Sequence, residues 1–474
     1  MNIGKTVRFA QWTPAAALLL ALSPYLTRQL WFDEALTVLN FACLGGPGEI
    51  YRAYVIPNNH ILYTVVLYYW LKLLPPGFAP DLWLRLPSVV FAVVLLGYLG
   101  RRFRRMCGAI PLAVVLTALA VSPPFLVFAT AVRGYMLGAL FCAWAAGSAA
   151  EFAASPRFRP FAKYFIAALG AVLTVPSDLA ALAGVVLFAL PWCGAKFWNE
   201  RKFYVLALTP VAALLLAYLP ISRNFIAVAQ LGEGWRGRWS SLAAVGLALA
   251  SAFGALLLLL PAEWVRGVKR WRRELWRAAI WFLPLPAAFV FAVAPFPRVY
   301  FPLFPLLALA VAGALRSFAG VNWHRKVERS IRIKLGIGFV VLLLSLLPWH
   351  LPVLGALSPH VGGDLGDDFF YGYHLRPEHQ PVRVAQALEK LPARSVYFSF
   401  LSDPWANMFY HLTRGGKAEY LFDGPRGQVA EIPVGAAAVL RRDESPEVLG
   451  RRFGRKLRQV SETPACNIFI VEAL

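Results

Sequence analysis

Residues Ala109–Ala129 read AIPLAVVLTALAVSPPFLVFA and contain no charged side chain. Uncharged stretches of this kind recur along the chain, for example at Ser241–Pro261 and Leu335–Trp349. Their length matches the hydrocarbon core of a bilayer, which a helix of roughly 20 apolar residues spans. Because the apolar runs are continuous and do not alternate with polar residues, they indicate helices and not the strands of a barrel. The sequence therefore predicts a polytopic membrane protein.

The basic residues are concentrated in the apolar part of the chain. The 474 residues are 59% hydrophobic and carry a formal net charge of +22. From Val353 onward 14 Lys/Arg balance 14 Asp/Glu, whereas the first 352 residues hold 33 basic and 11 acidic side chains. Basic residues between apolar segments follow from the rules of membrane topology, so the charge does not indicate binding to nucleic acid.

The same basic residues predict a topology of about eleven membrane-spanning helices with a cytoplasmic N-terminus. The first span covers about residues 10–27, and the first outer loop covers 28–83. Within that loop, His60–Leu74 is short for a span, and a crossing there would turn the arginines of 101–105 outward, so we expect a helix along the membrane surface. The remaining spans are predicted at about 84–100, 109–126, 134–150, 164–178, 179–194, 203–221, 241–260, 278–294, 299–315 and 335–352.

Two domains follow from this topology. Residues 1–352 form an all-α transmembrane domain, and residues 353–474 form a small soluble α/β domain outside the cytoplasm. The elements predicted in the second domain are helices at Val382–Leu391 and Asp403–Leu412 and strands at Ser395–Phe400, Ala436–Leu440 and Asn467–Val471. Five cysteines show no spacing typical of zinc sites or a disulfide framework, although a Cys43–Cys466 bridge remains an alternative.

Few acidic residues of the membrane domain fall on its outer side. They are Asp33, Glu34, Glu49, Asp81, Asp178 and Glu233. Asp33 and Glu34 are adjacent, follow the first span directly and are preceded by Trp31 and Phe32. An acid pair beside apolar side chains is costly to desolvate and indicates a functional site. The alternative is a solvated helix start with Asp33 as its N-cap.

A second polar cluster lies in the same outer loop and comprises Asn58, Asn59, His60 and Tyr63. Two amides, an imidazole and a phenol at the lipid–water boundary can orient polar headgroups or help to hold a cation. The alternative is a helix cap made by either asparagine, with His60 exposed to solvent.

Two arginines on the outer side oppose the usual bias of basic residues toward the cytoplasm. Arg133 and Arg298 each stand two residues before a tyrosine, Tyr135 and Tyr300 respectively. A guanidinium group binds phosphate through two parallel hydrogen bonds, so the pair indicates a phosphate site. The alternative for each arginine is an extended side chain that reaches the lipid headgroups.

Taken in order, these motifs resemble the GT-C superfamily of membrane glycosyltransferases, and within it the protein O-mannosyltransferase and aminoarabinose transferase group (glycosyltransferase family 39 or 83). The resemblance covers about residues 1–310 and does not extend to the C-terminal domain. It rests on Trp31-Phe32-Asp33-Glu34, Asn59-His60-Ile61-Leu62-Tyr63, Arg85-Leu86-Pro87-Ser88, Ser122-Pro123 with Ala131-Val132-Arg133-Gly134-Tyr135, and Arg298-Val299-Tyr300 with Pro302 and Pro305.

The resemblance implies a glycosyltransferase that takes a hexose or pentose from a polyprenyl-phosphate donor on the outer face of the membrane. It implies an acidic base in the first outer loop, here Asp33 with Glu34 beside it. Because a phosphate leaves without a general acid, one carboxylate opposite a cationic cluster predicts a single inverting displacement. The remaining assignments are donor and phosphate binding by Arg133, Tyr135, Arg298, Tyr300 and His60, and acceptor binding by Asn58, Asn59 and Tyr63.

Other functions stay open at the level of sequence. A lipid or sugar transporter or flippase would also be polytopic, and a non-catalytic assembly or sensor protein could use the outer domain to bind a partner. A divalent cation is left open, because Asp33, Glu34 and His60 supply few of the oxygen ligands that such an ion needs. The acceptor is not specified and is a lipid, a glycan of the cell envelope or a protein. The expected location is a bacterial inner membrane, with the C-terminal domain in the periplasm.

Overall fold

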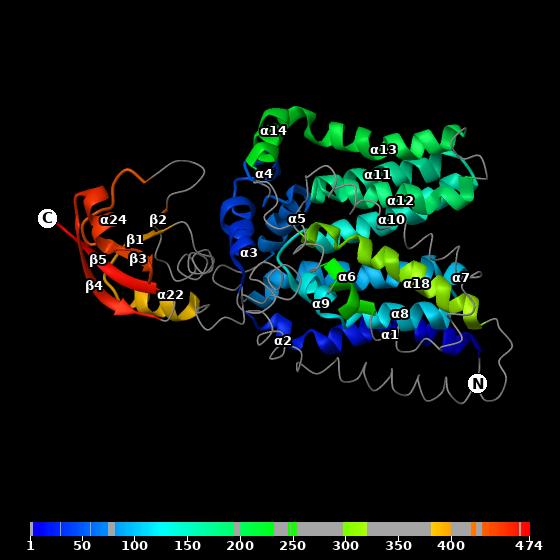
Figure 1. The fold of residues 1–474 in the computed structure, drawn as a ribbon, viewed down its shortest axis with the longest axis horizontal. Coiled ribbons are helices and arrows are strands. Elements are labelled where there is room, and N and C mark those ends of the chain that lie inside the picture. Colours follow the sequence, from blue (N-terminus) through cyan, green and yellow to red (C-terminus); the bar gives the residue numbers. More distant parts are fainter. Residues whose placement is uncertain are drawn as a thin grey trace.

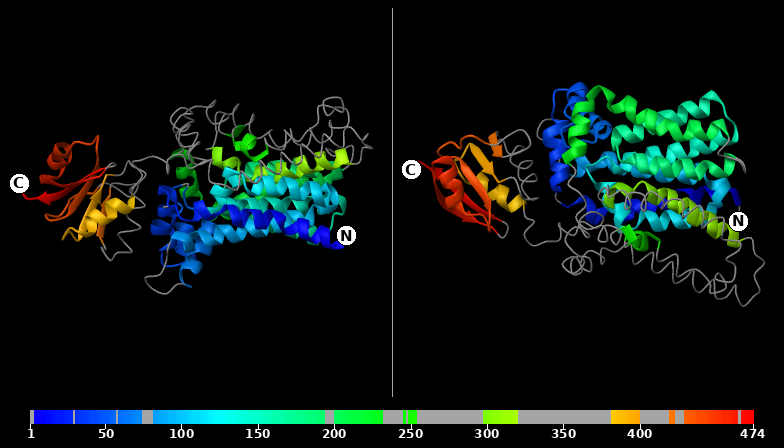
Figure 2. Two further views of the ribbon diagram at one scale, coloured as in Figure 1. Left: turned by 90° about the horizontal axis from the view of Figure 1, so that it is seen from below. Right: turned by 45° about the horizontal axis from the view of Figure 1, so that its top comes forward.

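A bundle of helices and a small sheet domain make up the chain (Figure 1). They are seen in a computed structural model, which describes residues 3–28, 30–56, 58–73, 81–193, 200–231, 245–246, 248–253, 297–319, 381–399, 419–422, 429–463 and 466–474. In two further views the sheet again lies beyond the end of the bundle that carries the first outer loop (Figure 2).

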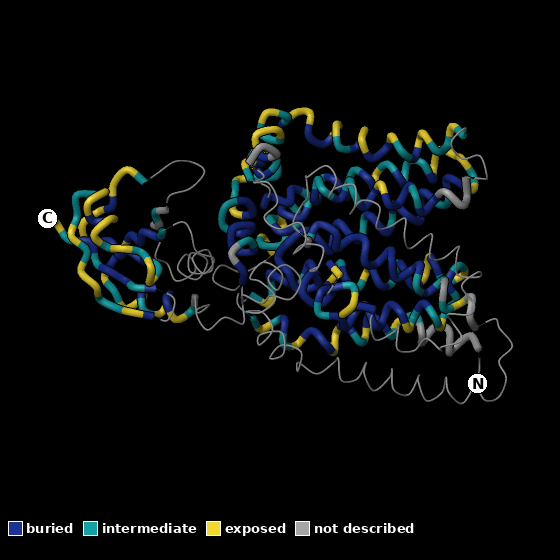
Figure 3. The backbone as a smooth tube through the Cα atoms, in the orientation of Figure 1, coloured by how far each residue is buried: buried dark blue, intermediate teal, exposed yellow. Residues whose placement is uncertain are grey.

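The bundle is built around one central helix, α10, which packs against helices that precede it and helices that follow it in the sequence. Its neighbours are α11, α12 and α6, and the tube coloured by burial shows these inner helices mostly buried (Figure 3). The elements are α1 (Ile3–Ala21), α2 (Ser23–Leu26), α3 (Phe32–Leu36), the π-helix η1 (Thr37–Ala42), α4 (Pro47–Arg52), α5 (Ile61–Leu71), α6 (Asp81–Arg102), α7 (Arg104–Cys107), α8 (Ala109–Ala120), α9 (Pro123–Thr130), α10 (Tyr135–Ala154), α11 (Phe158–Thr174), α12 (Asp178–Cys193), α13 (Arg201–Tyr218), the 3₁₀-helix η3 (Leu219–Ile221), α14 (Ser222–Leu231), the 3₁₀-helix η5 (Pro297–Tyr300) and α18 (Leu303–Ala319).

Three helices of the described residues are long and apolar enough to cross a membrane, namely Asp81–Arg102, Tyr135–Ala154 and Arg201–Val228. The number rises to four when α8 and α9 are counted as one bent span. The predicted total of about eleven spans is therefore not confirmed, and the spans at 278–294 and 335–352 lie outside the described residues. Leu208, Leu215 and Leu216 of α13 are exposed, as suits a face that contacts lipid.

The span predicted at 109–126 is wrong as a single helix. The structure breaks it into α8 and α9, which meet at an angle of 69°. Pro123 and Pro124 lack the N–H groups that would continue α8, and Ser122 before them takes an extended conformation with ψ of 143°, as a residue before proline tends to do. The proline pair in the sequence was sufficient to predict this break.

Helix α5 matches the segment His60–Leu74 that we expected to lie along the membrane. It has 11 residues and is therefore about 17 Å long at 1.5 Å per residue, roughly half the thickness of a bilayer core. Figure 1 shows it beside α3 and α4, at the end of the bundle nearer the C-terminus. Its length supports a helix that does not cross the membrane.

The C-terminal domain contains a five-stranded mixed sheet with the strand order β2-β1-β3-β5-β4. Strand β1 pairs in parallel with β2 and β3, whereas β5 runs antiparallel to β3 and β4. The elements are α22 (Pro381–Glu389), β1 (Ser395–Phe398), β2 (Glu419–Phe422), β3 (Ala437–Arg441), α24 (Pro446–Phe453), β4 (Lys456–Glu462) and β5 (Cys466–Glu472).

Side chains alternate between the two faces of this sheet, as strand geometry requires. Val396 on one face belongs to the same apolar cluster as Leu388 of α22. Tyr397 on the other face belongs to the cluster that contains Leu449 of α24. The sheet thus lies between two helices, which agrees with the predicted α/β class and with three of the predicted strands.

Some predictions for this region stay untested. The helix predicted at Asp403–Leu412 and the domain boundary at residue 353 lie outside the described residues. The alternative of a disulfide is wrong, because Cys43 and Cys466 are both free, and Cys466 is buried.

Candidate active site

Asp33 lies near the start of α3 and faces two arginines that come from distant parts of the chain. Its Oδ2 is 3.5 Å from Nη1 of Arg133 and 3.4 Å from Nη1 of Arg298. These distances exceed those of tight charge-assisted hydrogen bonds. The Asp33 side chain keeps 15% of its surface exposed, so the carboxylate is paired by charge and still accessible.

Arg133 is held in place by the residues around Asp33. It is almost fully buried, and its Nη1 donates to the backbone carbonyl of Asp33 at 3.3 Å. Its guanidinium group lies 5.6 Å from the ring centre of Tyr135, within the range of a cation–π interaction. A buried guanidinium is costly unless paired, so this position is not explained by an arginine that reaches outward to lipid headgroups.

Arg298 belongs to η5, which lies far from Asp33 in the sequence, and its side chain reaches the same carboxylate. Its guanidinium lies 5.2 Å from the ring centre of Trp31, the N-cap residue of α3. Tyr300 of the same turn is buried, and its hydroxyl has no hydrogen-bond partner among the described residues. The structure therefore brings both arginines to Asp33, where the sequence predicted a carboxylate opposite a cationic cluster, and places Tyr135 beside Arg133.

His60 completes the cluster and is buried, not solvated. Its Nδ1 accepts a hydrogen bond from the backbone N–H of Gly134 at 2.8 Å, so in the neutral ring the proton sits on Nε2. Nε2 is 3.2 Å from Nη2 of Arg133, which is also a donor. Two donors thus face each other, and an anionic oxygen is the group that would satisfy both.

Burial and the nearby charges of Arg133 and Arg298 lower the pKa of His60 well below its usual value. Burial is the largest cause, since it disfavours the charged form of the ring. His60 is therefore a neutral donor at physiological pH.

This low pKa predicts how stability depends on pH. The unfolded chain protonates His60 below about pH 6.5, whereas the folded chain does so only at lower pH. The free energy of unfolding should therefore decrease as the pH falls below about 6.5. The contribution of His60 to this decrease is up to about 1.4 kcal/mol per pH unit, and it should be absent above about pH 6.5. Denaturation of wild type and His60→Gln at about pH 7.5 and about pH 5.5 measures it. Equal losses in both proteins would mean that His60 is solvated.

Glu34 has a different position from the catalytic one that we predicted. Its Oε1 lies 2.9 Å from Nη1 of Arg85, and both side chains are fully buried. The Glu34 carboxylate also accepts hydrogen bonds from the backbone N–H groups of Val132 at 2.8 Å and Trp31 at 2.7 Å. Arg85 donates in turn to the carbonyl of Thr130 at 2.6 Å. A carboxylate surrounded by these fixed donors does not reach a substrate, so Glu34 joins α3, α6 and the segment before α10.

The three residues predicted to bind an acceptor are also buried and engaged with the protein. Asn58 donates to the carbonyl of Asp33 at 3.0 Å, and Asn59 donates to the carbonyl of Ile50 at 2.8 Å. The hydroxyl of Tyr63 is 3.1 Å from that of Ser88. The amide hydrogens of both asparagines are thus engaged by the backbone, and the side-chain oxygen of Asn59 is buried without a partner among the described residues. Their contacts indicate that they shape the first outer loop.

Arg85 is the residue of this site that sequence analysis missed. It was noted only as part of a motif, although an arginine within the apolar helix α6 is itself a signal for a buried partner. Asp33 was considered as an N-cap, but Trp31 holds that position, and the Glu34 carboxylate accepts a hydrogen bond from the Trp31 backbone N–H at 2.7 Å.

The surroundings of Asp33 do not suit a divalent cation. Two guanidinium groups lie within 3.5 Å of its carboxylate, and positive charge there repels a metal ion. Within the described ranges, His, Cys, Asp and Glu residues form no group of three or more that could hold a metal. We therefore derive no chemical step through a metal.

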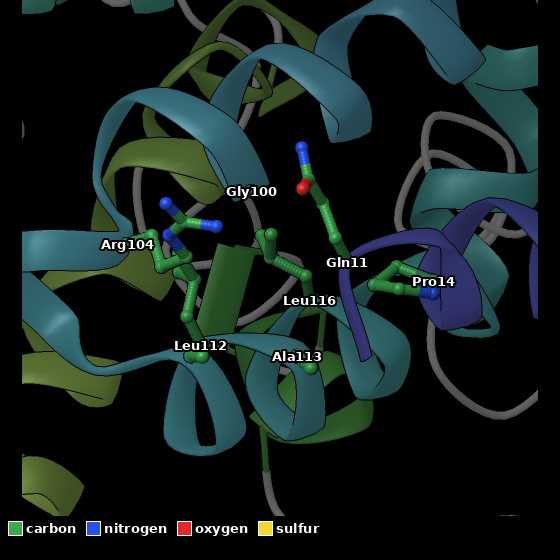
Figure 4. A pocket seen from close by; sticks show the side chains of 8 residues that line it. Gln11, Pro14, Gly100, Arg104, Leu112, Ala113 and Leu116 are labelled. Atoms are coloured by element: carbon green, nitrogen blue, oxygen red, sulfur yellow. The ribbon is translucent and has the colours of Figure 1, made fainter. Parts of the chain in front are cut away.

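A separate small cleft lies among α1, α6, α7 and α8 (Figure 4). Gln11, Gly100, Arg104 and Leu116 are among its lining residues. Figure 1 shows α7 at the end of the bundle opposite α3, so this cleft is not part of the cluster around Asp33.

Comparison with known proteins identifies the fold. Neither the comparison with protein families nor that with curated protein sequences finds a match. Among solved structures, the chain is similar to ArnT from Cupriavidus metallidurans bound to undecaprenyl phosphate, with a TM-score of 0.61 and 16% identity over 99% of this chain and 98% of that one. Its similarity to the apo state of the same protein has a TM-score of 0.58 and 15% identity over 98% of each chain. The chain therefore shares the fold of ArnT over nearly its whole length, which confirms the expected resemblance at the level of the fold.

Proposed function

We propose that this protein is a membrane glycosyltransferase that moves a sugar from a polyprenyl-phosphate donor to an acceptor hydroxyl or amine. The observation that carries the proposal is the convergence of Asp33, Arg133, Arg298 and His60, which combines one accessible carboxylate with three donors suited to phosphate. The fold is that of ArnT, whose crystal structure contains undecaprenyl phosphate. This supports the same class of lipid carrier here.

The cluster divides into two roles. Arg133, Arg298 and the Nε2–H of His60 bind the phosphate oxygens of the donor, where charge builds up as the bond to the sugar breaks. Asp33 accepts the proton of the acceptor as its oxygen or nitrogen forms the new bond to the anomeric carbon. The bond between that carbon and the phosphate oxygen breaks, and polyprenyl phosphate leaves with the electron pair. Attack opposite the leaving group inverts the anomeric centre.

A bound phosphate would also free the base for its role. Asp33 and the phosphate compete for the same two guanidinium groups, which lie 3.4 and 3.5 Å from Asp33. When the arginines turn toward the phosphate, the carboxylate is left to face the acceptor. Donor binding thus prepares proton removal.

We place the reaction on the outer face of a bacterial inner membrane, with a cytoplasmic N-terminus and a periplasmic C-terminal domain. The orientation follows the distribution of basic residues in the sequence, and the choice of membrane follows the family resemblance. The sheet domain lies beyond the same end of the bundle as α3 and α4 (Figures 1 and 2), so it is positioned to contribute to acceptor binding.

Purified protein in lipid nanodiscs tests the function directly. Mass spectrometry of co-purifying lipids should detect a polyprenyl-phosphate sugar, and this lipid should act as donor in a transfer assay. The alternative of a transporter or flippase predicts lipid or sugar flux across vesicles without transfer. Flux without any transfer product would contradict the proposal.

Removal of either arginine should weaken binding of the lipid phosphate. Arg133→Ala and Arg298→Ala each remove charge-assisted hydrogen bonds worth about 1.5–3 kcal/mol, so we expect the affinity for undecaprenyl phosphate to fall about tenfold or more. A matched control is Arg223→Ala, because Arg223 is exposed on α14 and lies outside the cluster. Titration of nanodiscs with undecaprenyl phosphate measures the effect. Wild-type affinity in both variants would contradict the assignment of these arginines to phosphate binding.

A further inference from the structure

Asp178, the first residue of α12, is a buried acid that the proposed reaction does not use. Its side chain has no exposed surface, and neither carboxylate oxygen has a hydrogen-bond partner among the described residues. Burial of a polar group without a partner costs several kcal/mol. In membrane proteins, acids of this kind usually mark the path or binding site of a substrate.

The carboxylate sits against a glycine of α10. A Cβ atom at Gly138 would lie 2.1 Å from Oδ2 of Asp178, so only glycine leaves room for the carboxylate. Gly134, four residues earlier, has the same relation to His60, since a Cβ there would lie 2.8 Å from Nδ1 of the ring. Residues four apart share one helix face and are separated by about 6 Å along the axis. Asp178 therefore lies about one helical turn from the imidazole that contacts the phosphate.

A second polar group without a partner comes from the neighbouring turn. Helix α12 packs against η5, the turn that carries Arg298. Tyr300 of η5 is buried, and its hydroxyl also lacks a partner among the described residues. Two groups without a partner among the described residues, a carboxyl group and a phenol hydroxyl, thus come from two packed elements, one of which carries Arg298.

We propose that Asp178, together with Tyr300, binds the hydroxyl groups of the donor sugar. The sugar is joined to the phosphate through its anomeric carbon, so its ring must lie within about one helical turn of the groups that hold the phosphate. Its hydroxyls supply the donors that a buried carboxylate lacks. This inference rests on the proposed function and deepens it, because it separates sugar recognition by Asp178 from phosphate binding by Arg133, Arg298 and His60.

Binding of two kinds of lipid distinguishes sugar recognition from a structural role. The full-length protein in nanodiscs is titrated with undecaprenyl phosphate and with undecaprenyl phosphoryl-glucose, -mannose and -arabinose. In Asp178→Asn and Gly138→Ala, the sugar-bearing lipid that binds wild type most tightly should bind about tenfold more weakly, whereas bare undecaprenyl phosphate should change less than about twofold. Gly138→Ala keeps the acid but displaces it, so it checks the position independently of the charge.

The matched control is Glu151→Gln, which makes the same acid-to-amide change in a partly exposed residue of α10 that pairs with Arg102 and Lys163. It should leave both affinities unchanged. Equal weakening of both lipids in Asp178→Asn, or unchanged affinity for the sugar-bearing lipid, would overturn the inference. The inference is also overturned if the wild-type protein binds undecaprenyl phosphate but binds none of the sugar-bearing lipids more tightly than undecaprenyl phosphate. If the wild-type protein binds none of these lipids, the proposed function itself is overturned.

Discussion

Asp33→Asn is expected to lower the transfer rate by about 10²–10⁴-fold, the usual contribution of a positioned general base. The asparagine amide keeps the shape of the side chain but does not take up the proton that the acceptor substrate loses. It also removes the negative charge that competes with phosphate for Arg133 and Arg298, so the affinity for undecaprenyl phosphate should stay the same or increase. Transfer rates under donor saturation, measured together with lipid binding, separate these two effects.

A matched control for this substitution is Glu49→Gln. Glu49 lies in the same loop and is exposed, and within the described part of the chain its carboxylate accepts a hydrogen bond only from the backbone N–H of Gly45. The control should transfer sugar at the wild-type rate. A normally expressed Asp33→Asn protein with full activity would remove Asp33 as the base. Loss of donor binding in that variant would instead indicate that Asp33 orders the arginines.

Disruption of the buried pair between Glu34 and Arg85 should have the largest effect on stability. Each side chain is fully buried, and the two lie 2.9 Å apart, so removal of one leaves the other as an uncompensated charge. Glu34→Leu and Arg85→Met should each lower the free energy of unfolding by about 3–5 kcal/mol. The double variant should lose less than the sum of the two, because apolar side chains of similar size replace both charges.

The free energies of unfolding of wild type, both single variants and the double variant form a double-mutant cycle. They are measured by unfolding in mixed micelles with increasing amounts of a denaturing detergent. Some loss should persist in the double variant, since the N–H groups of Trp31 and Val132 no longer have Glu34 as their acceptor. Additive losses would show that the two side chains do not stabilise each other. A Glu34→Leu protein of wild-type stability would contradict the buried pair.

The sequence predicted the chemistry of the site better than the roles of individual residues. Asp33, Arg133 and Arg298 could be found because charges beside apolar runs require partners. The roles of Asp33 and Glu34 could not be assigned, since adjacent helix residues point in different directions, and Arg85 of α6 decides which one is buried. The setting of His60 likewise depends on the backbone N–H of Gly134, which contacts it only in the folded chain.

The fold shows the same limit. Apolar runs predicted the helices, and strand patterns predicted much of the C-terminal sheet. The register of the sheet and the contact between Asp178 and Gly138 depend on packing between segments distant in sequence. Asp178 was recognised only as one of six outer acids, because its burial without a partner among the described residues is a property of the folded protein.

The cationic setting of Asp33 has a consequence for turnover. Cleavage converts the donor from a phosphodiester with one negative charge into a phosphate monoester with up to two, which faces the same two guanidinium groups. The spent carrier lipid thus loses the contacts of the sugar but gains charge facing the arginines, so it stays a competitor of fresh donor for the same site. Accumulated carrier would then slow the protein.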